Sequence, residues 1–222
     1  KRKCTRCAIR HAGEGKLYDL IKAKTMQATM SGRDALAIDL FLSAANSKKV
    51  LPITVATDTT STVQDINSST NSWWQAQTVA SGSFAARGIA DLRNLRDLII
   101  KQGQGGAPAP DQILTTQLIY ELYEMSNAPS IRYGARDEAD LSFSGLKFST
   151  ARIDFDPNPA TGNLYMLCNE DLSYVDHSDA ERNIGEFKEP VDQDVRTAKV
   201  IWMGNLVINN RRRLGYMSGI TA

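Results

Sequence analysis

The chain has few of the residues from which catalytic and metal sites are usually built. Its 222 residues include two histidines, His11 and His177, and three cysteines. An odd and small number of cysteines does not support a disulfide framework and fits a reducing compartment. Cys4 and Cys7 form one C-x-x-C pair with His11 nearby, whereas a tetrahedral zinc site needs four ligands. We therefore expect free thiols and no metal site.

Long apolar runs are also absent. No run of about eighteen apolar residues occurs, so the sequence predicts no membrane-spanning helix. The chain starts without Met and without the apolar stretch of a signal peptide, which favours a processed or truncated protein. Hydrophobic residues make up 42% of the chain, enough for a core in one large domain or two interlocked lobes. A formal net charge of +1 does not by itself indicate nucleic-acid binding.

Charge is unevenly distributed along the chain. Residues 1–24 carry eight basic side chains against two acidic ones, and residues 152–194 carry eleven acidic against three basic. One interpretation is two solvated surfaces. The other is contact between identical copies, because opposite charges on one chain favour head-to-tail packing. In that interpretation the basic start and the acidic stretch lie at or near different subunit boundaries.

Apolar spacing predicts three helices in the first part of the chain. The first covers residues 14–45, the second residues 84–101, and the third lies between Thr116, expected as its N-cap, and Pro129, expected after its end. The residues predicted to form their apolar faces are Leu17, Leu20, Ile21, Ala28, Ala35, Ile38 and Leu42; Ile89, Leu92, Leu95 and Ile99; and Leu118, Ile119, Leu122 and Met125.

The remaining segments read as loops and strands. Residues 52–72 are rich in Ser, Thr and Asn, which predicts a long surface loop with short strands that ends at Trp73 and Trp74. In a strand these neighbours would point to opposite faces, with at least one buried. Further strands are expected at residues 111–115, 146–148, 153–155, 164–167, 172–175 and 197–209. The sum predicts an α+β fold with a mostly antiparallel sheet.

Patterns that resemble catalytic motifs are incomplete. Asp176-His177-Ser178-Asp179 has triad residue types without a G-x-S-x-G elbow, and Gly103–Gly106 lacks the Lys-Ser/Thr of a phosphate loop. Arg211–Arg213 could contact phosphates, but an ion-paired interface or a solvated strand end is favoured. We expect no catalytic, cofactor-binding or metal-binding residues, no cofactor and no enzymatic activity.

Several motifs, taken in their order along the chain, resemble the major capsid proteins of tailed bacteriophages with the Hong Kong 97 fold. They are Glu14-Gly15-Lys16 leading into Leu20–Lys24, Asn71-Ser72-Trp73-Trp74, Pro110–Thr116 with Tyr120 and Tyr123, Ser144–Phe148, Asn163–Leu167, and Ala198–Leu206 continuing to Asn210-Arg211-Arg212. The resemblance covers almost the whole chain, and the last of these motifs is its most specific part.

The resemblance implies a domain organisation. Residues 14–46 would be a spine helix in a peripheral domain, residues 47–170 an axial domain, and residues 171–222 the return strands of the peripheral domain. Residues 1–13 would be the remnant of an extended loop. Family members have an N-terminal arm and a full hairpin loop before the spine helix, so we expect that a segment needed for shell closure is missing.

The resemblance also implies a function. The chain would assemble in the host bacterial cytoplasm, as hexamers and pentamers, into the icosahedral head shell of a virion around non-specifically contacted double-stranded DNA. Scaffolding, portal and decoration proteins are candidate partners, and no membrane is expected. The alternative is an encapsulin-like nanocompartment shell, which shares the fold. A soluble enzyme with a deep pocket near His177 is a further alternative.

Overall fold

The computed structural model describes residues 13–102, 109–131, 146–180, 183–186, 188 and 197–222. The chain divides into two compact units, which are described separately. The first unit combines residues 1–38 with residues 175–205, and the second combines residues 39–174 with residues 206–222. Helices and a mixed sheet occur together, which confirms the predicted α+β class at that level.

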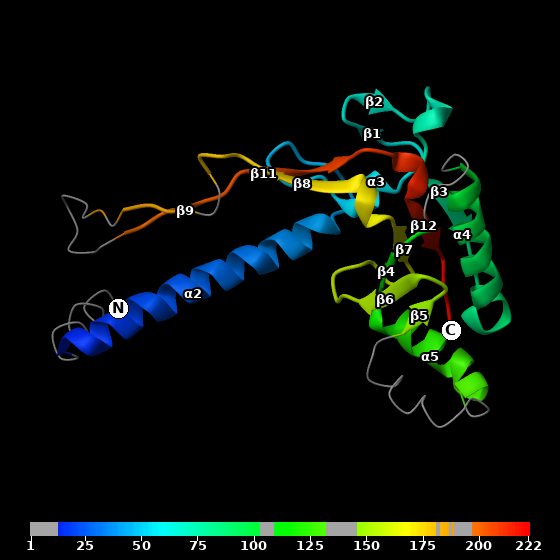
Figure 1. Cartoon of the computed structure of the whole chain (residues 1–222), viewed down its shortest axis with the longest axis horizontal. Helices are drawn as coiled ribbons and strands as arrows, with labels where there is room; N and C mark the ends of the chain where they lie inside the picture. Colours follow the sequence, from blue (N-terminus) through cyan, green and yellow to red (C-terminus); the bar gives the residue numbers. More distant parts are fainter. Residues whose placement is uncertain (1–12, 103–108, 132–145, 181–182, 187, 189–196) are drawn as a thin grey trace. The chain divides into compact units, whose positions relative to one another are not determined.

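The long helix α2 (Gly13–Leu40) supplies most of the first unit's described residues (Figure 1). It ends five residues before the predicted boundary, and beyond its end the carbonyl of Leu42 accepts a hydrogen bond from the hydroxyl of Thr54. Most of the described part of the predicted apolar face is not covered: Ile38 is 53% exposed, Ala28 and Ala35 are also exposed, and Leu42 is half-buried. Helical spacing therefore identified the helix but not a buried face.

Trp202 lies between β10 and β11 in the chain, and these two strands belong to separate two-stranded sheets. β9 (Asn183–Ile184) pairs antiparallel with β10 (Val200–Ile201), and β8 (Leu172–Asp176) pairs with β11 (Gly204–Ile208). The single strand predicted over residues 197–209 is wrong, because Trp202 and Met203 interrupt it. The backbone of Met203 bonds to His177 and Ala180, and the indole of Trp202 donates to Asp176 at 2.7 Å.

A six-stranded sheet forms the centre of the second unit. Its order is β3-β12-β7-β4-β6-β5; β3 pairs with β12 and β4 with β6 in parallel, and the other three pairs are antiparallel. The bounds are β3 Gln77–Ala80, β12 Gly215–Ser218, β7 Leu164–Leu167, β4 Gln112–Thr115, β6 Ala151–Phe155 and β5 Lys147–Phe148. β7 lies where the sequence predicted a strand, whereas β12 was not predicted.

The sheet is buried on both faces, which explains why every residue of β7 is covered. Leu164 and Met166 join one apolar cluster, and Tyr165 and Leu167 join the other. Alternate side chains of a strand point to opposite faces, so a continuously apolar strand fits a sheet with two cores. The second cluster includes the short helix α3 (Ile53–Ala56).

Helix α4 (Ile89–Gln102) belongs to the first cluster and follows a π-helical turn, η2 (Phe84–Gly88). Its predicted face is confirmed, since Leu92, Leu95 and Ile99 are buried.

Helix α5 (Gln117–Ile131) buries only part of the predicted face, since Ile119 and Leu122 pack in or against the first cluster but Leu118 and Met125 do not. Ile119 and Tyr123 are buried, whereas Leu118 is 42% and Met125 72% exposed. The predicted start and end also need correction. Thr116 precedes the helix, but its hydroxyl makes no hydrogen bond, and the helix continues through Pro129.

The Ser/Thr/Asn-rich segment is partly helical, which corrects the predicted loop. After α3 it forms a hairpin of β1 (Thr62–Val63) and β2 (Ile66–Asn67). It ends in a 3-10 turn, η1 (Ser72–Trp74), so the strand expected there is absent. Trp74 is 7% exposed and Trp73 54% exposed, which confirms that at least one of the two indoles is buried.

Candidate functional site

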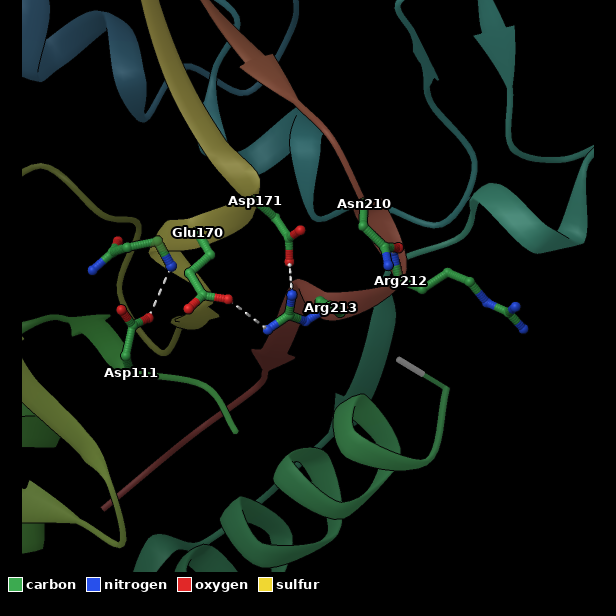
Figure 2. Close-up of polar contacts among 7 residues, drawn as sticks. Asp111, Glu170, Asp171, Asn210, Arg212 and Arg213 are labelled. Carbon is green, nitrogen blue, oxygen red and sulfur yellow. Dashed lines mark hydrogen bonds and ion pairs between the residues drawn. The ribbon is translucent and has the colours of Figure 1, made fainter. Parts of the chain in front are cut away.

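The basic run Arg211–Arg213 occupies a 3-10 turn, η5, between β11 and β12. The side-chain oxygen of Asn210 accepts a hydrogen bond from the backbone N–H of Arg212 at 3.2 Å, which caps the turn. Figure 2 shows that the side chains of Arg212 and Arg213 diverge from the turn. The three arginines therefore have different environments, which decide what each can do.

Arg211 is fully buried and binds only backbone carbonyl groups. Its Nε donates to Ala56 and its Nη1 to Ser61, both at 2.8 Å. Its Nη2 donates to Val55 at 2.8 Å and also to Asp58. Burial lowers the pKa of this guanidinium, although the charge of Asp58 opposes the shift. Arg211 thus holds the turn that follows α3 and is not accessible to a phosphate.

Arg213 is ion-paired with two carboxylates of the turn η4 (Asn169–Asp171), as Figure 2 shows. Its Nη1 lies 2.8 Å from Asp171 and its Nη2 lies 3.7 Å from Glu170. Burial raises the pKa of Asp171, the charge of Arg213 lowers it, and Glu170 raises it further. The ion-paired interpretation of the basic run holds for Arg213, but the pair lies inside this chain.

Arg212 has the only side chain of the three that lines a hollow. Its Nη2 donates to the side-chain oxygen of Gln102 at 2.7 Å. The hollow has a volume of ≈ 310 Å³, and its lining residues are Trp73, Trp74, Gln102, Asn209, Asn210 and Arg212. The sequence predicted that at least one of the two tryptophans is buried, but it did not place them beside Arg212.

A second hollow of ≈ 440 Å³ lies between α4, α5 and β5. Arg93, Arg96 and Tyr123 line it, and Arg96 is paired with Asp97 at 2.9 Å. The hydroxyl of Tyr123 donates to the backbone carbonyl of Lys147 at 2.8 Å, and burial raises its pKa. The Tyr123 hydroxyl thus holds α5 against β5, and the lining residues do not place a nucleophile beside a base.

The residues considered for catalysis do not form a triad in the described part of the chain. Asp176 accepts the indole of Trp202, and Nδ1 of the exposed His177 accepts the backbone N–H of Asp179 at 3.2 Å. Cys168 is buried, which raises the pKa of its thiol to about 11. The described residues contain no group of three or more metal-ligating side chains. Cys4, Cys7, His11 and Gly103–Gly106 lie outside the described residues.

No helix in the described ranges has the length and apolar character needed to cross a bilayer.

Comparison with solved structures shows a shared fold. No protein-family model matches the chain, and no curated protein matches it. Among solved structures, the chain is similar to one described as the cyanophage A-1(L) capsid asymmetric unit, with a TM-score of 0.60 and 13% sequence identity. The likeness covers 97% of this chain and 71% of that one. At this identity it establishes a shared fold: the chain has the fold of a protein from a cyanophage capsid.

Proposed function

We propose that the chain is the shell-forming major capsid protein of a tailed bacteriophage. The observation that carries the proposal is the likeness to the cyanophage capsid chain, which extends over 97% of this chain. The order of the sequence motifs supports the same assignment, because these motifs are features of the sequence and do not depend on the fold.

The finer features of the proposal follow from the Hong Kong 97 resemblance. Residues 14–46 serve as the spine helix, residues 47–170 as the axial domain and residues 171–222 as return strands, with residues 1–13 as a loop remnant. Subunits assemble in the host cytoplasm as hexamers and pentamers of an icosahedral head around double-stranded DNA. The chain acts mechanically and has no catalytic role.

Exposed apolar side chains in the first unit support a role in assembly. A concentration of large exposed apolar side chains in one unit is more than the scattered single ones usual on a soluble monomer, and favours association with another molecule. The exposed apolar side chains of this unit, each between 47% and 61% exposed, are Met26, Met30, Ile38, Val175, Val200, Ile201 and Met203. A shell subunit covers such side chains only when it meets its neighbours, and many weak contacts then sum over the copies.

The test is to express the full-length chain and examine it by sedimentation and electron microscopy. We expect closed particles built of hexamers and pentamers; a monomer that stays soluble at high concentration contradicts the proposal. Particles from infected cells should contain nuclease-protected double-stranded DNA. An enclosed protein cargo in place of DNA would instead assign the chain to an encapsulin-like compartment.

Charge reversal tests the role of the acidic stretch. Replacing Asp192 and Asp194 together by Lys should lower the particle yield while the subunit still folds, because opposite fields favour contact between copies. These two residues lie outside the described ones. The same double reversal at Glu121 and Glu124 on α5 is a matched control. Equal particle yields from the two double variants would count against a role for the acidic stretch.

A further inference from the structure

The hollow between α4, α5 and β5 is lined by two arginines that lie on one side of α4. Ile89, Arg93 and Arg96 follow one another at spacings of four and three residues, which places them on one face of the helix. Arg93 is exposed and Arg96 is half-buried, so both guanidinium groups can be reached from solvent. Like charges one turn apart repel each other, and an anion held between them would relieve that repulsion. The arrangement therefore favours an anion in this hollow.

Neutral polar groups of α5 and of the turn after β5 complete the lining. Burial raises the pKa of Tyr123, whereas a hydrogen bond with Asn127 and the charge of Arg93 lower it. The guanidinium of Arg93 therefore lies close enough to α5 to act on the hydroxyl of Tyr123. Asn127 and Ser149 line the same hollow. The hollow thus combines two cations with neutral amide and hydroxyl donors.

The backbone of Ser149 has a conformation that is usual for glycine. Ser149 has φ +57° in the two-residue turn between β5 and β6. Residues other than glycine rarely have a positive φ, whereas glycine adopts it without steric cost. The turn by itself does not require a hydroxyl group at this position. A serine is explained if its hydroxyl serves the hollow that it lines.

The donors and the size of the hollow define the chemistry of the anion. Nε and Nη2 of Arg96 both donate to one oxygen of Asp97, at 3.1 and 2.9 Å, and the N–H groups of Nη1 remain for a ligand. A phosphate group has three strong acceptor oxygens, which matches donors from several residues better than a carboxylate does. The volume of ≈ 440 Å³ is within the range of small-molecule sites. It therefore admits a phosphate together with part of the group that carries it.

We propose that this hollow binds a phosphate group, held by Arg93 and Arg96 with the hydroxyl of Ser149 as a further donor. The inference goes beyond the proposed shell function and does not depend on it. Asp97 offsets one of the two positive charges, so we expect an affinity in the millimolar range for inorganic phosphate. The phosphate group can come from a small phosphate ester or from the backbone of a nucleic acid, and the experiment separates these sources.

The test measures the Tm of the full-length protein in inorganic phosphate and in sodium chloride of the same ionic strength. A ligand that binds only the folded state raises the Tm as its concentration rises. We expect Arg93→Gln and Arg96→Gln each to weaken phosphate binding by about tenfold, the change expected for one charge-assisted hydrogen bond. Arg152→Gln is the matched control, because Arg152 is also exposed and paired with a carboxylate but does not line the hollow. This variant should bind phosphate as the parent does.

Ser149→Gly gives the proposal a signature that a structural role would not produce. Glycine adopts the positive φ of this turn more readily than serine, so the protein should unfold at the same or a higher urea concentration. The change also removes the hydroxyl group, so phosphate binding should weaken. Chemical labelling tests the site without any substitution. Phosphate should protect Arg93 and Arg96 of the parent from phenylglyoxal, measured by mass spectrometry, and leave Arg152 reactive.

A second arm replaces inorganic phosphate by a short DNA duplex. Duplex binding that is weakened by Arg93→Gln and Arg96→Gln, and kept by Arg152→Gln, assigns the site to a nucleic-acid backbone. Phosphate binding without such duplex binding assigns it to a small phosphate ester. The inference is overturned if the parent binds neither probe, if both arginine variants bind like the parent, or if phosphate protects neither arginine. None of these results bears on the shell function, which depends on particle formation alone.

Discussion

Arg211 provides the sharpest test of how the fold is held together, because its fully buried guanidinium binds four backbone carbonyl groups. Arg211→Met keeps most of the buried stem and removes all of these donors. Each buried polar group left without a partner costs about 1–3 kcal/mol, although water entry and relaxation recover part of that cost. We therefore expect a loss of about 3–5 kcal/mol, less than the full cost of four unpaired carbonyl groups because of that recovery.

The assay is equilibrium unfolding of the full-length subunit in urea, with thermal unfolding as a second readout. For a chain of about 200 residues, this loss corresponds to a fall in Tm of roughly 6–20 °C. Arg211→Lys should recover only part of the stability, since an ammonium group cannot span carbonyls spread over Val55 to Ser61. Arg212→Met is the matched control at the next position and should cost less than about 1 kcal/mol.

Two results would refute this reasoning. Stability of Arg211→Met within about 1 kcal/mol of the parent would mean that the four carbonyl groups find other donors. A comparable loss in Arg212→Met would mean that the basic run acts as a unit and that burial does not distinguish its members.

Three further predictions concern single positions. Gly162→Ala should lower the free energy of unfolding in urea by about 2 kcal/mol, because Gly162 has φ +80° and an added Cβ would lie 2.9 Å from the carbonyl oxygen of Ile220. Gly32→Ala is the control: Gly32 has open space around it, so this change should be neutral or stabilising. Cys168 should resist thiol reagents at pH 8 in mass spectrometry of the native chain, because a pKa of about 11 leaves roughly one thiolate in a thousand; rapid labelling would contradict its burial. Burial alone would raise the pKa of Asp58, but hydrogen bonds from neighbouring hydroxyl and backbone groups lower this pKa below 3.8 overall. The ionised carboxylate therefore stabilises the fold above pH 3.8, and this stabilisation is lost as the pH falls below that value. Asp58→Asn should lose less stability than the parent on acidification, and an unchanged pH profile would contradict this.

The sequence predicted a helix well where its apolar spacing is compatible with only one buried face. In α4 the spacing of Leu92, Leu95 and Ile99 defines a single face, and that face is buried. Helix α5 has adjacent apolar pairs, such as Leu118 with Ile119, so its spacing allows two overlapping faces. The sheet selects the face with Ile119 because its core meets that side, and no local pattern contains this information.

The residues of the candidate site were harder to predict because their partners are distant in sequence. Arg211 binds carbonyls about 150 residues earlier, which is invisible to any local pattern. A basic triplet ordinarily indicates an exposed segment or an anion-binding site. For that reason the sequence predicted neither the turn η5 nor the strand β12 that follows it. The motif that includes Trp73 and Trp74 did indicate an anchor, but only the fold places it at the same hollow as Arg212.

The geometry of a 3-10 turn explains why three identical neighbours have three different roles. With about three residues per turn, successive side chains project roughly 120° apart. Arg211 binds the carbonyls of the turn after α3, Arg213 pairs with Asp171, and Arg212 lines the hollow. Substitutions in this run should therefore be interpreted position by position. Loss of particles in an Arg211 or Arg213 variant would report on the fold of the subunit, whereas Arg212, which is only half-buried, is the member of the run whose loss the fold should tolerate best.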